Sequence, residues 1–562
     1  MDQSSNTLWN ADLAPTTAAQ RTWRWWHFAA LWLGMVIAVP AYMLAAGLIE
    51  QGMSATQAVW AVLLGNLIVL VPMLLIGHAG AKWGVPYAVL ARASFGWRGA
   101  RAPALARAIV ACGWYGIQTW IGGGALLTLL GVMVGKSLVG PLVPVLGIGV
   151  GQLLSFAAFW LIQLLFVTKG LETVRKLETW TAPVKVIVCG LLVWWALSKA
   201  GGLGPILHEP SAYDAGGAKA GRFWQDFGPA VTAMTGYWAT LALNIPDFTR
   251  FARTQRDQIV GQVVGLPGPM ALLATMSVIV TSATVLIYGK PIWDPVALSG
   301  NIGGIAVLVG LLVISLDTVS CNIAANLVGP AYDFSALWPS RISYRTGGYI
   351  TAAIGVLIMP WKLLESTQGY IFVWLTGYGA LLGPVAGILI ADYWLLRRAR
   401  LDVEALYDRT GRYTYFRGWN LAAVAAFVIG VAPNLPGFLK AAGLPSAAGI
   451  GAPWTGLYDY AWFVGAGIAA GVYVAGMRLG NGAKALHGAE YRTVSTLYSN
   501  DGKRAAEVRE FANGETYLVE SEWIAGTTFV DRHSGSMVGP FASPEHAERF
   551  IVATEWFVGE ER

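Results

Sequence analysis

The chain has 562 residues, of which 55% are hydrophobic and 12% are charged, and its formal net charge is +6. Soluble globular proteins carry about 25% charged residues, so this composition excludes a typical soluble enzyme. Apolar stretches long enough to cross a bilayer recur between Phe28 and Leu479. We therefore expect an all-α polytopic membrane protein, whose positive charge reflects membrane topology and requires no nucleic-acid partner.

Twelve membrane spans are expected in a domain of residues 27–480, after a cytoplasmic N-terminal segment of residues 1–26. Lys and Arg gather in every second loop, for example at Lys82, Arg92 and Arg250. Cytoplasmic loops carry such an excess, so the sequence predicts a cell (plasma or inner) membrane protein with both termini in the cytoplasm. The spans are expected near 27–49, 57–78, 103–134, 145–168, 180–199, 228–251, 262–288, 301–329, 346–360, 367–396, 418–437 and 458–479.

Two of these spans contain residues that interrupt a helix. The first span contains Pro40, and the sixth contains Gly236 and then Pro246. Proline lacks an amide hydrogen and glycine weakens a helix. Because the two spans stand five apart, the pattern predicts two inverted five-helix repeats with broken helices at the centre. Ordinary kinks, which are common in membrane helices, are the alternative.

The eighth span carries an unusual number of polar residues. Asp317, Ser320 and Cys321 share one helical face, and Asn322 and Asn326 share a face one turn apart. Polar groups are costly in hydrocarbon and normally face a bundle interior or a cavity. This row suits a dehydrated small ion beside a heterocycle, although Ser and Asn also serve as polar contacts between membrane helices.

The third span adds groups that suit a flat ligand. Trp114 and Gln118 are four residues apart and therefore lie on one helical face. An indole offers a stacking surface and a primary amide offers donors and an acceptor to a ring edge. Trp238 in the sixth span could supply the opposing face, and Asn326 a second amide. The alternative for each residue alone is ordinary packing.

Other charged residues suggest structural roles. Lys185 is expected to extend its ammonium group from an early turn of the fifth span to the membrane interface. Asp392, near the inner end of the tenth span, is expected to be an interfacial anchor, with a gating ion pair as the alternative. The six histidines form no ligand-spaced pair, which argues against a metal site.

The tail from about Gly480 has a different composition. Its apolar runs stop and its charge rises, and residues 516–520 and 527–531 alternate like short strands. Ser543 and Pro544 are suited to begin a helix as its N-cap and first residue. We expect residues 481–562 to form a small α+β cytoplasmic module or a partly ordered tail, with no catalytic set.

Several separated stretches resemble the nucleobase–cation symporter-1 family, which includes purine, cytosine, uracil, allantoin and hydantoin permeases. The similarity covers about residues 25–480 and leaves out the tail. It implies two five-helix inverted repeats, two extra helices and transport by alternating access. The stretches are GHAGAKWGVPYAVLARASFGWRGA (77–100), CGWYGIQTWIGG (112–123), NIPDFTRFAR (244–253), SCNIAANLVGPAYDF (320–334) and GPVAGILIADYWLLRR (383–398).

The resemblance also implies a substrate site. In the family's sodium–hydantoin transporter two tryptophans sandwich the ring, and a glutamine and an asparagine bind its edge. The matching positions here are Trp114, Trp238, Gln118 and Asn326. A further glutamine of that transporter falls on Ala38, so one polar contact is missing.

The family's sodium site is implied as well. Its carbonyl ligands match Gly34, Ile37 and Asp317, and one hydroxyl ligand matches Ser320. Cys321 replaces the threonine that supplies the other hydroxyl, and a thiol is a poor ligand for a hard cation. The coupling cation is therefore expected to be Na⁺ or H⁺, with Asp317 as the candidate proton carrier.

We expect a secondary active transporter that imports a planar heterocycle of the uracil, cytosine, allantoin or hydantoin type by cation symport. Its partners would be this small molecule and the lipid bilayer, and no cofactor is expected beyond the coupling cation. One alternative is a membrane-embedded enzyme, which would need a convergent catalytic set that the sequence does not contain. The other is a membrane sensor that binds a ligand and signals through the tail.

Overall fold

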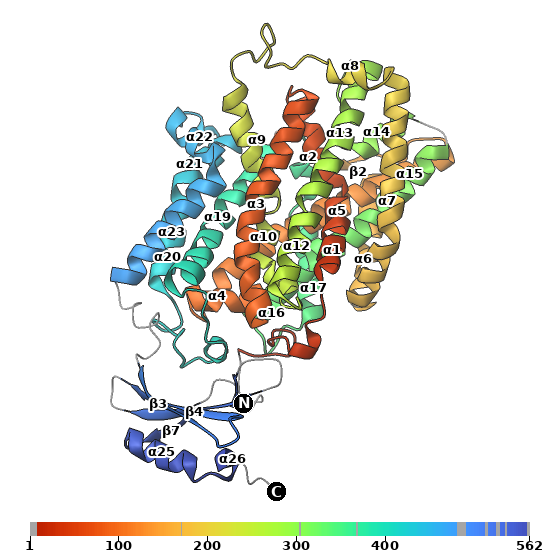
Figure 1. Ribbon diagram of the computed structural model, residues 1–562. Helices are drawn as coiled ribbons and strands as arrows, with labels where there is room; N and C mark the ends of the chain where they lie inside the picture. The colour runs from red at the N-terminus through yellow and green to blue at the C-terminus, as the bar shows by residue number, and fades with distance from the viewer. Residues whose placement is uncertain are drawn as a thin grey trace. The chain divides into compact units, whose positions relative to one another are not determined.

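A computed structural model of the chain describes residues 8–169, 171–302, 305–366, 369–479, 491–511, 515–523, 529–533 and 537–558. The chain divides into two compact units, Met1–Gly476 and Met477–Arg562. The first unit is a bundle of helices and the second contains a β-sheet (Figure 1). The predicted boundary at residue 480 falls outside the described ranges.

The first unit is built almost entirely from helices. Between α5 and α6 it also has a two-stranded antiparallel hairpin, β1 (Leu142–Val143) and β2 (Ile148–Gly149). The helices are α1 (Trp25–Val36), α2 (Val39–Glu50), α3 (Ala55–Trp83), α4 (Tyr87–Phe95), α5 (Arg101–Val134), α6 (Val150–Lys169), α7 (Leu171–Ala200), α8 (Leu203–Leu207), α9 (Phe223–Tyr237), α10 (Ala239–Asn244), α11 (Pro246–Thr249), α12 (Gln255–Gly265), α13 (Pro267–Tyr288), α14 (Pro295–Ile302), α15 (Ile305–Asn322), α16 (Val328–Leu337), α17 (Tyr344–Leu357), α18 (Pro360–Leu363), α19 (Thr376–Ile390), α20 (Leu421–Val431), α21 (Leu435–Ala441), α22 (Ala452–Asp459) and α23 (Ala461–Leu479).

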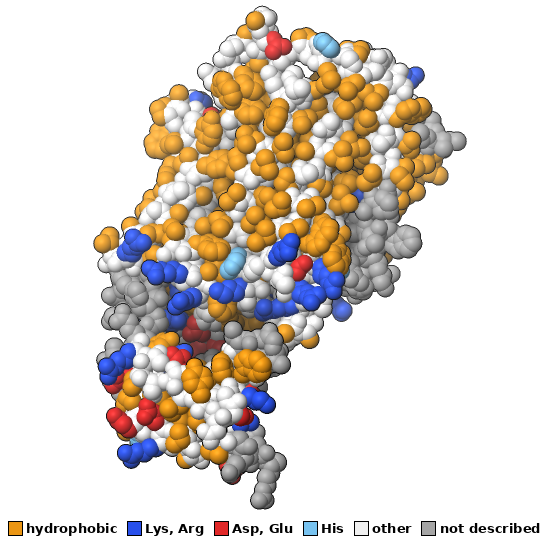
Figure 2. Space-filling view, in the orientation of Figure 1, with side chains coloured by type: hydrophobic (Ala, Val, Ile, Leu, Met, Phe, Trp, Pro, Cys, Tyr) orange, Lys and Arg blue, Asp and Glu red, His pale blue; other side chains and the backbone are white. Residues whose placement is uncertain are grey.

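Each of the twelve predicted spans contains helical residues. Among the described residues, seven helical segments are long and apolar enough to cross a bilayer, and the bent pair α1–α2 makes an eighth candidate. Val150–Leu165 of α6 is a shorter apolar helix within the described residues. Apolar side chains cover the visible face of the bundle, and Lys and Arg gather at the end where α4 lies (Figure 2).

Both predicted helix breaks are confirmed. The first lies between α1 and α2, whose axes differ by 58°, and Pro40 stands in the first turn of α2. The second lies between α9 and α10, where Trp238 adopts a non-helical backbone conformation. Proline at a helix start is favourable because its missing amide hydrogen would have no intrahelical partner there. Each break leaves backbone groups without intrahelical partners in the middle of the bundle.

The eighth span is less regular than predicted. It continues from α15 through a π-helical turn at Ile323–Leu327, called η2, into α16. Two further π-helical turns, η3 (Gly369–Leu375) and η4 (Ala391–Leu396), flank α19. Such turns insert one residue per turn and often mark functional segments. The predicted span near 301–329 therefore contains a π-helical turn that the sequence analysis did not anticipate.

Helix α5 lies at the centre of the contacts that build the site. It packs against α6, α15, α16 and α17. A Cβ atom on Gly116 would lie 2.3 Å from the carbonyl oxygen of Gly355 in α17, so only glycine permits this close approach. Small residues at helix contacts allow such close packing in membranes. This contact holds the stretch that contains Trp114 and Gln118 in the bundle interior.

The second unit contains a five-stranded antiparallel sheet and two short helices. The strands have the order β3-β4-β5-β6, and β7 also pairs with β5. Apolar residues of the sheet, such as Val508 and Leu518, pack with Ile551 and Trp556. Ser543 caps the first helix as predicted, since its side chain accepts a hydrogen bond from the His546 amide. The elements are β3 (Tyr491–Tyr498), β4 (Arg504–Phe511), β5 (Thr516–Trp523), β6 (Phe529–Asp531), β7 (Val538–Phe541), α25 (Pro544–Val552) and α26 (Glu555–Val558).

Candidate substrate and cation site

Two tyrosines from the tenth span bond to backbone carbonyls at the two helix breaks. The Tyr370 hydroxyl donates to the carbonyl oxygen of Pro40 at 3.0 Å. The Tyr378 hydroxyl donates to the carbonyl oxygen of Tyr237 at 3.2 Å. Both hydroxyls are buried, and buried carbonyls need such partners. The segment η3–α19 therefore contacts both breaks in this conformation.

Trp114 lies inside a cluster of aromatic rings. Its indole is buried and meets Tyr237, Tyr370, Trp374 and Tyr378 edge-on, with ring centroids 5.2 to 6.2 Å apart. Sequence reasoning missed these four neighbours. The signal available for three of them was the spacing of Tyr370, Trp374 and Tyr378, which recur every four residues and so tend to share a helical face.

Trp238 is also buried and is held in place from two sides. Its Nε1 donates to Oδ1 of Asn66 at 2.8 Å, and its ring packs edge-on against Trp32 at 5.3 Å. The ring of Tyr237 contacts both predicted stacking residues, at 5.2 Å from Trp114 and 4.7 Å from Trp238. The indoles of Trp114 and Trp238 therefore both contact the ring of Tyr237.

The two predicted amides have buried polar partners. Nε2 of Gln118 lies 3.8 Å from Sγ of Cys321, and Nδ2 of Asn326 donates to Oδ1 of Asn322 at 2.9 Å. Asn322 is fully buried and donates in turn to the carbonyl oxygen of Tyr115 at 3.0 Å. These bonds connect α15 and η2 to the face of α5 that carries the predicted substrate residues.

Lys185 lies at the predicted cation site. Its side chain is 2% exposed, its ammonium forms an ion pair with Asp317, and it lies 3.4 Å from the carbonyl oxygen of Gly34. The expectation that Lys185 reaches the membrane interface is therefore wrong. A side chain on α7 can meet α1 and α15 here because both helices pack against α7. The signal in the sequence was a single lysine in an otherwise apolar stretch.

The other predicted sodium ligands are engaged with protein groups or lie at the helix break. The Ser320 hydroxyl donates to the carbonyl oxygen of Asp317 at 3.1 Å. Sγ of Cys321 lies 3.7 Å from the carbonyl oxygen of Met35. Ile37 is the C-cap residue of α1. In the described part of the chain, no group of three or more His, Cys, Asp and Glu side chains is placed to hold a metal ion.

A cavity of about 390 Å³ adjoins the ion pair. Its lining is mainly apolar and comes from α2, α7, α13, α14 and α15. Lys185, Asp317, Ile37 and Ala38 all contribute to this lining, whereas Trp114, Gln118, Trp238 and Asn326 do not. This cavity therefore adjoins the cation-site residues and is not the predicted ring site.

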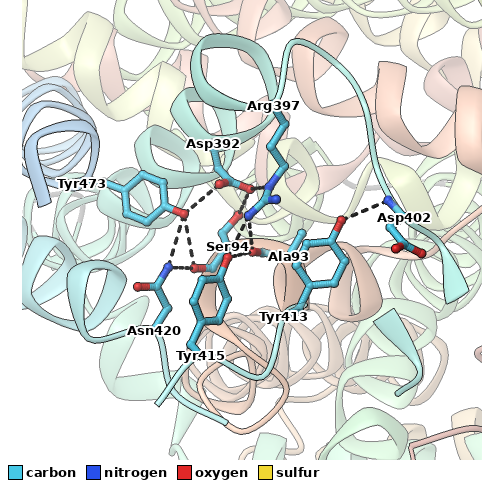
Figure 3. A network of polar contacts seen from close by, with 9 residues as sticks. All are labelled: Ala93, Ser94, Asp392, Arg397, Asp402, Tyr413, Tyr415, Asn420 and Tyr473. Carbon is cyan, nitrogen blue, oxygen red and sulfur yellow. Dashed lines mark hydrogen bonds and ion pairs between the residues drawn. The ribbon is translucent and has the colours of Figure 1, made fainter. Parts of the chain in front are cut away.

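A second buried ion pair lies at the end of the tenth span. Asp392 is 1% exposed and accepts a hydrogen bond from Nε of Arg397 at 2.7 Å. Asp392 also accepts from the hydroxyls of Tyr473 at 2.7 Å and Ser94 at 3.0 Å (Figure 3). The predicted interfacial anchor is therefore buried in an ion pair, which is the contact that the alternative expected, and these bonds connect α4, η4 and α23 inside the protein.

Comparison with known proteins identifies the family. The sequence profile of the permeases for cytosine/purines, uracil, thiamine and allantoin matches residues 15–465. A purine-uracil permease of Arabidopsis thaliana is 43% identical, over 84% of this chain and 78% of its own length. An allantoin permease of Bacillus subtilis is 42% identical, over 85% of this chain and 94% of its own length.

Solved structures agree with this assignment. Mhp1, a nucleobase-cation-symport-1 family transporter in a closed conformation with bromovinylhydantoin bound, is similar with a TM-score of 0.70 and 25% identity. The alignment covers 86% of this chain and 98% of that one. These similarities give no support to the enzyme or sensor alternatives. The chain is a multi-pass membrane transporter and belongs to the nucleobase–cation symporter-1 family of permeases for cytosine/purines, uracil, thiamine and allantoin.

Proposed function

We propose that this transporter imports a planar nucleobase or related heterocycle, which stacks between Trp114 and Trp238 and is bound at its edges by Gln118 and Asn326. The observation that carries the proposal is the burial of all four residues beside the two broken helices. Indole faces bind flat rings with little regard to ring type, whereas amides select by hydrogen bonding. The named substrates of the relatives, purines, uracil and allantoin, all belong to this chemical class.

Opening of the ring site requires Tyr237 to move. Its ring contacts both indoles edge-on, so a ligand ring that stacks on both of them would take the place of the tyrosine ring. The bonds from Tyr370 and Tyr378 to the helix breaks would have to break when η3 and α19 open the site. Alternating access then couples ring binding to the packing of the broken helices.

Uptake of radiolabelled uracil and allantoin into proteoliposomes tests the ring site. Trp114→Ala should abolish saturable uptake, because it removes one stacking face. Trp120→Ala is the matched control, since this tryptophan lies on the same helix but packs against Phe156 and Trp361. Equal loss of uptake in both variants, or unchanged uptake in Trp114→Ala, would contradict the proposed site.

We further propose that the coupling ion is a proton and that Lys185 takes the place of a coupling sodium ion. The ammonium of Lys185 contacts the Gly34 carbonyl, which is a predicted sodium ligand, and the side-chain carboxylate of Asp317, whose backbone carbonyl is another. A third predicted ligand, Cys321, offers sulfur instead of oxygen, and Na⁺ prefers oxygen. These contacts support a protonated amine, instead of a sodium ion, at this position.

The ion pair can couple proton binding to conformation because it joins three helices. Lys185 on α7 contacts the end of α1 through Gly34 and contacts α15 through Asp317. Protonation of Asp317 neutralises the carboxylate and removes the charge that holds the ammonium between α1 and α15. A ligand shifts a conformational equilibrium only through different affinities for the two states. A proton on Asp317 would supply this difference.

Uptake into proteoliposomes whose lumen contains no sodium tests the coupling ion. With no sodium outside, an inward proton gradient should drive accumulation of substrate. With sodium added outside at equal pH on both sides, the inward sodium gradient should not drive it. Accumulation that needs sodium and ignores the proton gradient would refute proton coupling while leaving the ring site intact.

We also propose that both termini lie in the cytoplasm. The end of the bundle that carries α4 is rich in Lys and Arg, as expected for a cytoplasmic face (Figure 2). Single cysteines placed at residues 3 and 560 of a variant without native cysteines should react with an impermeant thiol reagent only after the membrane is opened. Labelling of intact cells would place the termini outside.

A further inference from the structure

The cavity beside the Lys185–Asp317 pair is large for a protein interior. Its volume is about 390 Å³, and its walls come from α2, α7, α13, α14 and α15. Packed interiors contain few voids larger than a water molecule. Ligand pockets have volumes of about 300–1,000 Å³. The cavity is therefore a candidate binding site of its own, separate from the proposed ring site.

The lining of this cavity selects an apolar occupant. Most of its residues are aliphatic or aromatic, such as Leu192, Trp195 and Val313. Water does not fill apolar cavities well, because it finds too few hydrogen-bond partners there. An empty cavity is also unfavourable, since the atoms of its walls lose van der Waals contacts. A hydrocarbon chain would restore these contacts without leaving a polar group unpaired.

The cavity opens on the outer surface of the bundle. Three residues that line it, Leu191, Trp194 and Val309, are 57%, 68% and 51% exposed. They belong to α7 and α15, which pack against each other at one edge of the bundle (Figure 1). In a membrane transporter, exposed apolar side chains of this kind face the lipid tails. An occupant can therefore enter the cavity directly from the bilayer.

The length of the cavity matches one leaflet of a bilayer. Its lining follows α7 from Lys185 to Trp195 and α15 from Asp317 to Val307. At 1.5 Å per residue, each of these stretches is about 15 Å long. The hydrocarbon core of a bilayer is about 30 Å thick, so one leaflet supplies about half of that. The buried ion pair lies at one end of both stretches, and Trp195 and Val307 lie at the other.

We propose that this cavity binds one acyl chain of a membrane phospholipid, with the end of the chain beside Lys185 and Asp317 and the head group beyond Trp195. The apolar lining, the opening toward lipid and the length of one leaflet all fit this occupant. Lys199 is exposed and stands four residues after Trp195, so it lies on the same face of α7. Its ammonium is suited to bind the lipid phosphate. A chain in this position excludes water from the side of the ion pair that faces the cavity.

Photo-crosslinking of the full-length protein in liposomes tests this proposal. Two phosphatidylcholines carry a diazirine, one at the end of an acyl chain and the other next to the ester group. The chain-end lipid should modify Asp317, a residue of the cavity wall that is only 5% exposed. The ester-side lipid should modify residues near Trp195 and leave Asp317 unmodified. Proteolysis and mass spectrometry locate the modified residues.

Gly310→Phe should fill the cavity and displace the acyl chain. Gly310 lines the cavity, and a Cβ atom placed on it would meet no other part of the described protein within 4 Å. The variant should lose the modification of Asp317 by the chain-end lipid. The matched control is Gly467→Phe on α23, because Gly467 has the same free space but does not line the cavity. The control should keep the modification of Asp317.

Modification confined to exposed residues such as Leu191 and Trp194 would mean that lipid only surrounds the bundle, and it would overturn the proposal. Modification of Asp317 that persists in folded Gly310→Phe, or that comes from the ester-side lipid, would overturn it as well. If Gly310→Phe does not fold, the comparison of the two lipids on the unmodified protein decides the matter. Each of these failures would leave the ring site and proton coupling standing, because uptake experiments test those separately.

Discussion

Two of the buried ion pairs of the bundle, Lys185–Asp317 and Asp392–Arg397, differ in their surroundings. Asp392 accepts from Tyr473, Ser94 and Arg397, and Arg397 also donates to the carbonyl oxygen of Ala93 at 2.9 Å. Lys185 and Asp317 instead line a cavity beside the broken first helix. Both pairs are buried, and the Asp392–Arg397 pair lies within a network of tyrosines, a serine and backbone groups (Figure 3).

This difference suggests different roles. Removal of two charges from water costs several kcal/mol per ion, and only good geometry with additional hydrogen bonds offsets the cost. The Asp392–Arg397 pair has these additional hydrogen bonds, which connect α4, η4 and α23 and stabilise their packing. The Lys185–Asp317 pair joins α7 to the first helix break and α15, where a change of charge can alter helix packing. The comparison therefore assigns stability to one pair and coupling to the other.

The largest effect is expected from Lys185→Met. It leaves Asp317 buried without its cation, which should lower the free energy of unfolding by about 3–5 kcal/mol and abolish proton-driven accumulation. The double variant Lys185→Met/Asp317→Asn should recover most of the stability but not the accumulation. Thermal unfolding and proteoliposome uptake measure the two quantities. Proton-driven accumulation in the double variant would remove the coupling role from this pair.

A smaller and different effect is expected from Asp392→Asn. Arg397 loses its buried carboxylate, so the free energy of unfolding should fall by about 3 kcal/mol. Folded protein should still bind uracil with unchanged affinity and accumulate it with the same dependence on the proton gradient. Binding and uptake at a temperature well below the unfolding midpoint test this. Loss of coupling without loss of stability would reverse the assignment of the two pairs.

The smallest effect is expected from Cys321→Thr, which supplies the hydroxyl that the sodium site of the family would have. Because the Lys185 ammonium still lies between Gly34 and Asp317, this change should not make uptake depend on sodium. Substrate affinity should change by about threefold at most, since the contact to Gln118 is weak. Uptake at several sodium concentrations is the measurement. A new sodium requirement would mean that the cysteine, and not Lys185, excludes sodium.

Much of the fold followed from the sequence because its signals are local. Pro40 and Gly236 marked the breaks, and apolar length marked the spans. The Ser543–Pro544 pair marked the start of α25. The π-helical turn η2 had no such local signal in the sequence.

The candidate site was less predictable, because many of its contacts join residues far apart in the sequence. Trp114 and Gln118 could be placed on one face of α5 from spacing alone. Asp317, the partner of Lys185, and Ser94 and Tyr473, which donate to Asp392, lie far away in sequence, so spacing along one helix could not reveal them. The direction of the Asn322–Asn326 bond depends on the Tyr115 carbonyl, which no side-chain pattern reveals.

Proton movement during transport tests the coupling assignment most directly. Sodium-free proteoliposomes that contain the transporter and a trapped pH-sensitive dye would receive uracil or allantoin from outside. We predict acidification of the lumen as substrate enters, and no acidification with Asp317→Asn. A constant lumenal pH during substrate entry, together with uptake that requires sodium, would contradict the account.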